Sequence, residues 1–584
     1  MIFSSHPNPQ FERESFISLN GEWNFGFSKA TLGFKFSENA DRAFKIYKKA
    51  DYTHKITVPY CIESKLSGIG YTGFVNLVWY RKTVELVSDG RRVHLHVGAA
   101  DYITSVIVNG TYIGRHRGGY TSFSFDITDA VVSGANEIFI LCEDDNKNRF
   151  VPRGKQSERL KSHGCDYTRT TGIWQSVYIE YTPKDYIADF RIYPDAEKSQ
   201  ISIELDLSGE NKSAEVEAEA VFDGKSVGTA KAKVLENGRA KLILNLSEKH
   251  LWEAGNGRLY DLELKYGEDK VKSYFGLRSV SLDGYKFLVN GKSVFQRLVL
   301  DQGFYKDGIY TAKDDDELKR DIELSMSLGF NGARLHQKVF DPRFLYFCDI
   351  LGYIVWGEYG NWGFDISSKK GVQIFANEWS EAVKRDFNHP SIIGWCPFNE
   401  TWDYKKRPQY DGLLSYVYEL TKEMDPTRPC IDTSGNYHVK TDVYDVHDYN
   451  GDVEFFKNNF DKFAVSGELY EHVLLDNPGR QKYPGGIPVM VSEYGGIKWE
   501  TDSEFKSWGY GEDVHSPEEF AQRYCGLTDA LIQNKNMCGF CYTQLYDIEQ
   551  EQNGLFTYTR EKKFSDDIYE KLKASNAQIA EIEK

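Results

Sequence analysis

The chain has 584 residues, more than one hydrophobic core usually supports, so two to four domains are expected. Its 87 acidic and 71 basic side chains give a net charge of −16, which argues against nucleic acid or an anionic membrane as a partner, because both need a basic surface. The first residues lack a signal-peptide pattern, and no run approaches ~20 apolar residues. We therefore expect a cytoplasmic protein without a membrane span, unless a signal peptide has been trimmed.

Residues 1–182 show the alternation of short strands with one buried face. Segments 92–97, 103–108 and 123–127 follow this two-residue period, and Asn109-Gly110 is a hairpin turn signal. No convincing helical period is present in this span. We predict a β-sandwich for residues 1–182.

Residues 183–277 alternate in the same way, for example at 201–207 and 241–246. The length suits a small immunoglobulin-like sandwich, and the segment is rich in Glu and Lys but poor in reactive side chains. A supporting domain is the expected role.

The pattern changes in residues 278–584, where short apolar strands alternate with helices. Acidic residues from Asp314 onward open one helix, and Ser516-Pro517 opens another. The eight candidate strands are 294–300, 330–336, 353–358, 392–399, 430–433, 443–449, 489–493 and 538–544. Cys538 and Cys541 fall in the last of them, which favours buried thiols over a metal site. Eight strands with intervening helices indicate a (β/α)₈ TIM barrel.

The carboxyl ends of barrel strands form the active-site face of such folds, so polar residues at those ends are the candidate site. These residues are Arg334, His336, Glu358, Asn399, Glu400, His447, Asp448, Tyr449, Glu493 and Gln544. The set is rich in carboxylates and lacks the nucleophile elbow of serine hydrolases. Paired carboxylates suit acid/base work on a glycosidic bond.

Glu400 and Glu493 each come directly after a buried apolar run, at the fourth and seventh strands. A carboxylate in that place is costly unless it is solvated, paired or functional. The alternative to a catalytic role is a structural one, in which Glu493 caps a helix or pairs with Arg334. Two such glutamates at two strand ends favour catalysis.

The chain resembles glycoside hydrolase family 2, the β-galactosidase, β-glucuronidase and β-mannosidase group, over essentially its whole length. The motifs that carry the resemblance are Leu19-Asn-Gly-Glu-Trp23, Trp79-Tyr-Arg81, Gly172-Ile-Trp174, Phe287-Leu-Val-Asn-Gly-Lys292, Phe330-Asn-Gly-Ala-Arg334, Cys348-Asp-Ile-Leu-Gly-Tyr-Ile-Val-Trp356, Asn388-His-Pro-Ser-Ile-Ile-Gly-Trp395, Asn399-Glu400 and Ser492-Glu-Tyr-Gly495. It implies a jelly-roll-like sugar-binding domain, an immunoglobulin-like sandwich and a catalytic barrel, in that order.

The resemblance also implies roles. Glu400 would be the general acid/base and Glu493 the nucleophile of a retaining double displacement, with carboxyl groups roughly 5–5.5 Å apart. Asn399 would bind the substrate 2-hydroxyl, and Tyr449 would orient the nucleophile unless it is a surface tyrosine. Asp166 precedes Gly172 at the spacing of a family aspartate that reaches the sugar pocket; the alternative is a loop residue bonded to its own backbone.

The sequence departs from the best-known members around the pair. Glu551-Gln552-Asn553-Gly554 stands where β-glucuronidases carry Asn-x-Lys-Gly, and a glutamate there would repel a sugar carboxylate. His336 is shifted by one position from the histidine of family β-galactosidases. We expect an exo-acting β-galactosidase-like enzyme on a carbohydrate substrate, with β-mannosidase and α-L-arabinopyranosidase-like specificities as alternatives. A carbohydrate-binding protein on an inactive barrel is the non-enzyme alternative. No metal or cofactor is expected, and a homo-oligomer is left open.

Overall fold

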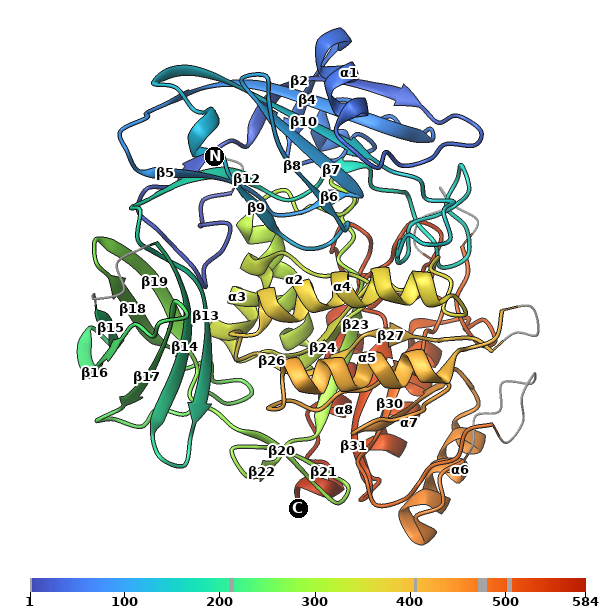
Figure 1. Cartoon of the computed structure of the whole chain (residues 1–584). Helices are drawn as coiled ribbons and strands as arrows, with labels where there is room; N and C mark the ends of the chain where they lie inside the picture. The colour runs from blue at the N-terminus through green and yellow to red at the C-terminus, as the bar shows by residue number, and fades with distance from the viewer. Residues whose placement is uncertain (1–2, 210–214, 404–406, 471–479, 501–506) are drawn as a thin grey trace.

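The computed structural model describes residues 3–209, 215–403, 407–470, 480–500 and 507–584. Figure 1 shows an N-terminal sandwich in blue, a smaller sandwich in green and a barrel that runs from yellow to red. The two sandwiches flank the barrel, so the fold class predicted from the sequence is confirmed. None of the helices in the described ranges is long and apolar enough to cross a membrane.

The N-terminal sandwich consists of two main antiparallel sheets. The larger sheet has the order β3 (His54–Val58), β2 (Gly21–Lys29), β4 (Val75–Leu86), β10 (Gly134–Glu143), β7 (Ile103–Val108) and β8 (Thr111–Arg117). The other has the order β1 (Ile17–Ser18), β12 (Val177–Thr182), β5 (Arg92–Val97) and β9 (Phe123–Asp126), and a short pair joins β11 (Gly172–Ile173) to β6 (Ala100–Asp101).

One element of this sandwich was not predicted. Helix α1 (Asp41–Lys49) lies in a span where the sequence shows no clear helical period. The helix is short, and its Ala43 is buried against Ile107, Phe139 and Leu141 of the larger sheet. Packing against a sheet stabilises a helix too short to be evident from its own pattern.

The described part of the second sandwich has seven antiparallel strands in two sheets, the layout typical of an immunoglobulin-like domain. One sheet contains β13 (Tyr186–Asp195), β14 (Gln200–Ser208) and β17 (Arg239–Asn245); the other contains β16 (Lys225–Lys233), β15 (Glu215–Phe222), β18 (Tyr260–Tyr266) and β19 (Asp269–Phe275). The predicted alternation is visible along β14, where Ile201, Ile203 and Leu205 are buried in the core between the sheets.

Within the described residues, the barrel contains eight successive parallel strands. They are β23 (Gln296–Asp301), β24 (Gly332–Leu335), β25 (Ile354–Glu358), β26 (Ile392–Cys396) with its continuation β27 (Phe398–Asn399), β28 (Thr433–Ser434), β29 (Tyr444–Asp448), β30 (Val489–Gly495) and β31 (Met537–Thr543). Strand β31 pairs with both β30 and β23, which joins the last strand to the first. The short meander β20 (Val280–Asp283), β21 (Lys286–Val289) and β22 (Lys292–Ser293) precedes the barrel.

Seven helices alternate with these strands in the described residues. They are α2 (Asp315–Ser327), α3 (Pro342–Leu351), α4 (Lys369–Asp386), α5 (Asp411–Met424), α6 (Val453–Ser466), α7 (Pro517–Ile532) and α8 (Asp566–Asn576). Both predicted helix starts are confirmed: the Asp314 side chain accepts from the Glu317 amide at 2.9 Å, and the Ser516 hydroxyl from the Glu519 amide at 3.1 Å. The (β/α)₈ pattern is interrupted once, because residues 435–443 cross from β28 to β29 without a helix.

One loop of the N-terminal sandwich reaches the carboxyl ends of the barrel strands. Residues 144–171, the sandwich loop, connect β10 to β11. The Arg153 amide donates to the Trp362 carbonyl at 3.0 Å, and the Trp508 indole donates to the Gly164 carbonyl at 2.7 Å. Gly154 approaches the barrel so closely that an added Cβ would lie 2.4 Å from the Gln337 carbonyl oxygen. The active-site face of the barrel is therefore shared with the first domain.

Candidate active site

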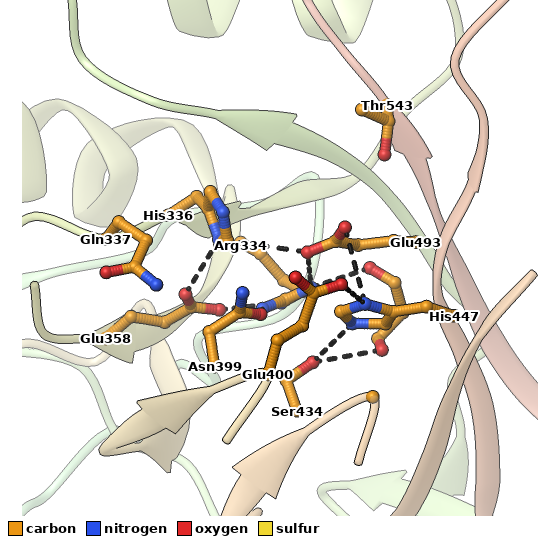
Figure 2. A network of polar contacts seen from close by, with 12 residues as sticks. Arg334, His336, Gln337, Glu358, Asn399, Glu400, Ser434, His447, Glu493 and Thr543 are labelled. Carbon is orange, nitrogen blue, oxygen red and sulfur yellow. Dashed lines mark hydrogen bonds and ion pairs between the residues drawn. The ribbon is translucent and has the colours of Figure 1, made fainter. Parts of the chain in front are cut away.

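Glu400 and Glu493 meet at the carboxyl ends of the barrel strands. Glu400 directly follows β27, and Glu493 belongs to β30. Figure 2 shows the two carboxyl groups close together, with His447 beside both. One oxygen of each glutamate and a ring nitrogen of His447 all lie within 4.8 Å of one another. The fold thus brings together two carboxylates that are 93 positions apart in the sequence.

The backbone of Glu400 is held in an uncommon conformation. Its φ of +47° lies in the left-handed region, which side-chain-bearing residues seldom occupy. The Glu400 amide donates to the Ser434 carbonyl at 2.9 Å, and the Glu400 carbonyl accepts from the Trp402 amide at 2.9 Å. Such strain persists where the surroundings enforce it, and it is concentrated at functional sites.

Arg334 connects the other strand-end residues. Its guanidinium lies 2.6 Å from Glu358, 3.1 Å from Glu493 and 3.1 Å from the Asn399 side-chain oxygen. His336 is 3.2 Å from the second oxygen of Glu358. All these side chains are buried, so the ionised groups satisfy one another instead of being solvated. The predicted pairing of Glu493 with Arg334 is real, but it is one contact within a larger network (Figure 2).

The charges around Glu493 favour its ionised form. Burial alone would raise the pKa of this carboxyl, but its neighbours, His447 foremost and Arg334 among the others, lower it to about 2. His447 lies 2.8 Å from Glu400 and 3.4 Å from Glu493, and burial is outweighed by these carboxylates, which raise the pKa of its imidazole. Burial, followed by the charge of Lys155, lowers the pKa of His336 well below its ordinary value.

Tyr449 and Asn399 lie against the pair. The Tyr449 hydroxyl donates to Glu493 at 2.5 Å, and its ring stacks on Tyr510 with centroids 3.6 Å apart, so this tyrosine is not a free surface residue. The backbone of Asn399 is held by two hydrogen bonds with the Asn361 side chain, at 2.9 and 3.0 Å. The Asn399 side-chain nitrogen is buried and has no hydrogen-bond partner among the described residues. That donor is available to a ligand.

Asp166 lies at the barrel face without touching the glutamate pair. Its carboxylate accepts from Arg153 at 3.0 Å and is 3.8 Å from His163. Its carbonyl accepts from Gln550, a residue of the loop that follows β31, at 3.2 Å. The prediction that the loop of Asp166 reaches the barrel is in keeping with this position, while a contact of its side chain with substrate stays a prediction.

Lys155 and Trp362, which lie near the pair, were not predicted from the sequence. Lys155 is 6% exposed, and its ammonium lies 3.8 Å from the ring centroid of Trp362. Burial would lower the pKa of Lys155, but the thiol of Cys165 and the carboxylates of Glu551, Glu493 and Glu400 raise it. The lysine lies more than 200 positions before either catalytic candidate, so no local motif could have indicated its place.

A cavity of about 190 Å³ opens beside Glu400. Its lining includes two tryptophans and two arginines, Trp362, Trp402, Arg153 and Arg407. The cavity is lined by Glu400 and not by Glu493, so the surroundings of the two glutamates differ.

Two groups of described residues have ligand atoms close enough to share an ion: Glu400, His447 and Glu493, and separately Glu158, His163 and Asp166. Each group already has protein partners, since Arg334 binds Glu493 and Arg153 binds both Glu158 and Asp166. The expectation of a site without a metal stays a prediction.

Comparison with known proteins identifies the domains. Residues 280–496 match the description "Glycosyl hydrolases family 2, TIM barrel domain", and residues 185–278 match "Glycosyl hydrolases family 2". A putative β-glucuronidase of Formosa agariphila is 25% identical over 72% of this chain and 50% of its own length. A β-galactosidase of Thermoanaerobacter pseudethanolicus is 25% identical over 75% of this chain and 61% of its own length. The chain thus aligns with only half to three fifths of these two relatives.

The fold has a counterpart over nearly its full length. A β-glucuronidase of Bifidobacterium dentium, solved in complex with coumarin-3-O-glucuronide, superimposes with a TM-score of 0.78 and covers 98% of both chains at 19% identity. That likeness concerns the fold alone. The two matched domains together span more than half of the sequence, and the chain therefore belongs to glycosyl hydrolase family 2.

Proposed function

We propose that the protein is a retaining β-glycosidase that releases terminal sugars, with Glu493 as nucleophile and Glu400 as general acid/base. The observation that carries the proposal is the close approach of the two carboxylates, whose oxygens lie within 4.8 Å of one another. Inverting enzymes need roughly 6.5–9.5 Å between their carboxyl groups to admit a water molecule. The short separation favours direct attack by one carboxylate.

In the first step, Glu493 forms a bond to the anomeric carbon while the bond to the leaving-group oxygen breaks. Glu400 donates its proton to that oxygen. The depressed pKa of Glu493 keeps the nucleophile ionised at neutral pH. Tyr449 and Arg334, which hold separate oxygens of Glu493, orient it toward the sugar.

In the second step, water attacks the anomeric carbon of the glycosyl-enzyme and Glu493 leaves. Glu400, now a carboxylate, accepts the proton of that water. The unpaired Asn399 nitrogen is suited to bind a sugar hydroxyl, and a hydrogen bond to the 2-hydroxyl that strengthens in the transition state accelerates such reactions.

The cavity beside Glu400 fits the leaving group, because the acid that protonates the leaving oxygen must face it. The indoles of Trp362 and Trp402 offer apolar faces to a sugar ring or an aromatic aglycone. Trp362 also borders the sugar side, because its indole donates to the Asn399 carbonyl at 3.2 Å and Lys155 lies against its ring.

We propose a β-uronide, with a β-glucuronide first, as the sugar. The Formosa relative is named a putative β-glucuronidase, and the Bifidobacterium structure is that of a β-glucuronidase. The charge of Glu551, which the sequence suggested would repel a sugar carboxylate, is engaged inside the protein: Tyr167 donates to one oxygen and Asn553 to the other at 3.0 Å. Burial raises the pKa of Glu551.

A β-galactoside, the substrate expected from the sequence, is the second candidate because the Thermoanaerobacter relative is a β-galactosidase. None of the relatives quoted above is a β-mannosidase or an α-L-arabinopyranosidase, so those specificities are not proposed.

The proposal is tested with 4-nitrophenyl glycosides. The wild type should cleave the β-glucuronide fastest among β-glucuronide, β-galacturonide, β-galactoside, β-glucoside, β-mannoside and α-L-arabinopyranoside. The first sugar observed by proton NMR should be the β-anomer, and the α-anomer would refute retention. Glu400→Ala should regain activity with azide and yield the β-glycosyl azide, because azide replaces the water that Glu400 activates. Glu493→Gln should be inactive with or without azide.

A further inference from the structure

Most cations near the glutamate pair are already bound to protein groups. Arg334 binds Glu358, Glu493 and the Ser492 carbonyl. His447 binds Glu400 and, through its other nitrogen, the Ser434 hydroxyl at 3.0 Å. A substrate anion would have to compete with these protein partners for either group.

Arg153, the cation of the sandwich loop nearest to Lys155 in sequence, is also engaged. Its guanidinium donates to Asp166 and to Glu158, each at 3.0 Å. It therefore neutralises acidic groups of its own loop.

Lys155 is different. Within the described part of the chain, no hydrogen bond or ion pair reaches its ammonium; the Trp362 ring is the contact that holds it. The carboxylates of Glu551, Glu493 and Glu400 act on it electrostatically from beyond ion-pair distance. The attraction of these carboxylates outweighs the cost of burial, so the side chain is charged, but its N–H groups have no acceptor among the described residues and can bind a ligand anion.

The position of Lys155 is fixed by its backbone. The Lys155 carbonyl accepts from the Tyr167 amide at 2.7 Å, and the Tyr167 hydroxyl bonds to Glu551 of the barrel. Gly154, immediately before it, adopts a φ of +58° in direct contact with the barrel. The backbone of Lys155 is thus fixed at the barrel face, and the Trp362 ring contacts its ammonium.

We propose that Lys155 is the residue that recognises the carboxylate of a uronic-acid substrate, and that the N-terminal sandwich thereby determines the charge specificity of the barrel. The inference rests on the proposed β-uronide activity. Four glutamates, Glu358, Glu400, Glu493 and Glu551, are buried or half-buried around the pocket, so a substrate carboxylate needs a cation that is not already committed to them.

A purely structural or electrostatic role predicts something else. If Lys155 served only to keep Glu493 ionised, its loss would slow every substrate alike, because Glu493 attacks all of them. If it served only to hold the loop, its loss would lower stability. Recognition of a carboxylate instead predicts a loss that depends on the charge of the sugar.

The test compares wild type with Lys155→Met on three substrates: 4-nitrophenyl β-glucuronide, 4-nitrophenyl β-glucoside and the β-glucoside of 4-hydroxybenzoate. The first two differ in having a carboxylate or a hydroxymethyl group on the same ring, and the third carries its charge on the leaving group. The ratio of kcat/KM for glucuronide over 4-nitrophenyl glucoside should fall about 100-fold, as expected when a buried charge loses its partner. Lys155→Arg should retain part of the ratio, and Lys161→Met, which removes an exposed lysine of the same loop, should leave it intact.

Stability is measured alongside. The urea midpoint of Lys155→Met should stay close to that of the wild type, because removing a buried charge that lacks a hydrogen-bond partner offsets the lost attraction to the nearby carboxylates. An unchanged ratio with a uniform loss overturns the inference while the uronidase proposal stands. A loss of kcat/KM confined to the 4-hydroxybenzoate glucoside also overturns it, because the lysine would then bind the carboxylate of the leaving group. If the wild type cleaves only uncharged sugars, the proposed substrate falls and the inference falls with it.

Discussion

Replacing His447 by Asn should shift the acidic limb of the pH–rate profile to higher pH. The imidazolium is the foremost of the charges that depress the pKa of Glu493 from 4.5 to about 2. At 3.4 Å a full charge is worth about 5 kcal/mol with an effective dielectric constant of about 20. Burial of Glu493 opposes that attraction, and the amide and entering water replace part of it. A net rise of about 1 to 2 units in the pKa of Glu493 is therefore expected.

The direction of the shift in the acidic limb follows from the proposed reaction. Glu493 must be ionised to attack, so raising its pKa removes activity at low pH and leaves the neutral range less affected. The assay is kcat/KM for the preferred 4-nitrophenyl glycoside between pH 3 and 7, which reports the ionisation of the free enzyme. Ser434→Ala is the matched control, because it removes the hydroxyl 3.0 Å from the other nitrogen of His447 but keeps the charge. An acidic limb that stays in place or moves to lower pH in His447→Asn would refute the electrostatic reasoning.

Two further predictions concern stability. Gly154→Ala should lower the free energy of unfolding by about 2–4 kcal/mol and reduce activity, because the alanine adds left-handed strain and overpacking against the Gln337 carbonyl. The control is Gly164→Ala, which has a similar φ of +54° but lies in open space and should cost only the strain. Equal urea midpoints for the two variants would contradict the predicted contact. His438 lies 2.7 Å from Asp432, and although burial lowers its pKa, Asp432 and then Asp445 raise it to about 10 from 6.5. A raised pKa stabilises the fold fully below pH 6.5, and this stabilisation is lost as the pH rises through 10. The urea midpoint of the wild type should therefore fall between pH 7 and 10. A steeper fall in His438→Gln than in the wild type would be inconsistent with this cause.

The barrel could be predicted from the sequence because its strands are buried on both faces and read as short apolar runs. Strand β30 lies at 489–495 where 489–493 was expected, and β31 at 537–543 where 538–544 was expected. The catalytic candidates followed from the rule that parallel strands direct their carboxyl ends to one face. Helix α1 could not be predicted, because its stability comes from the sheet that it covers.

The hydrogen-bond and ion-pair partners of the site residues were harder to predict from the sequence than the site residues themselves. The side chain of Arg334 could be placed at a strand end, but the sequence gives no order among Glu358, Glu493 and Asn399, all of which it binds. Lys155 was missed because its place depends on a loop that folds onto another domain. A tertiary contact of that kind leaves no period or spacing in the sequence.

On the two proposals above, the chemistry and the specificity of this site come from separate folding units. The barrel alone supplies Glu400, Glu493 and Arg334, whose mutual contacts need no residue of the first domain. The sandwich loop supplies Lys155 and Asp166, and it is held to the barrel by contacts such as that between Tyr167 and Glu551. We therefore expect changes in that loop to alter which sugar is accepted without disturbing the proposed catalytic pair. On this arrangement, sugar selectivity should follow the sandwich loop when it is exchanged between members of the family, and the retaining stereochemistry should follow the barrel.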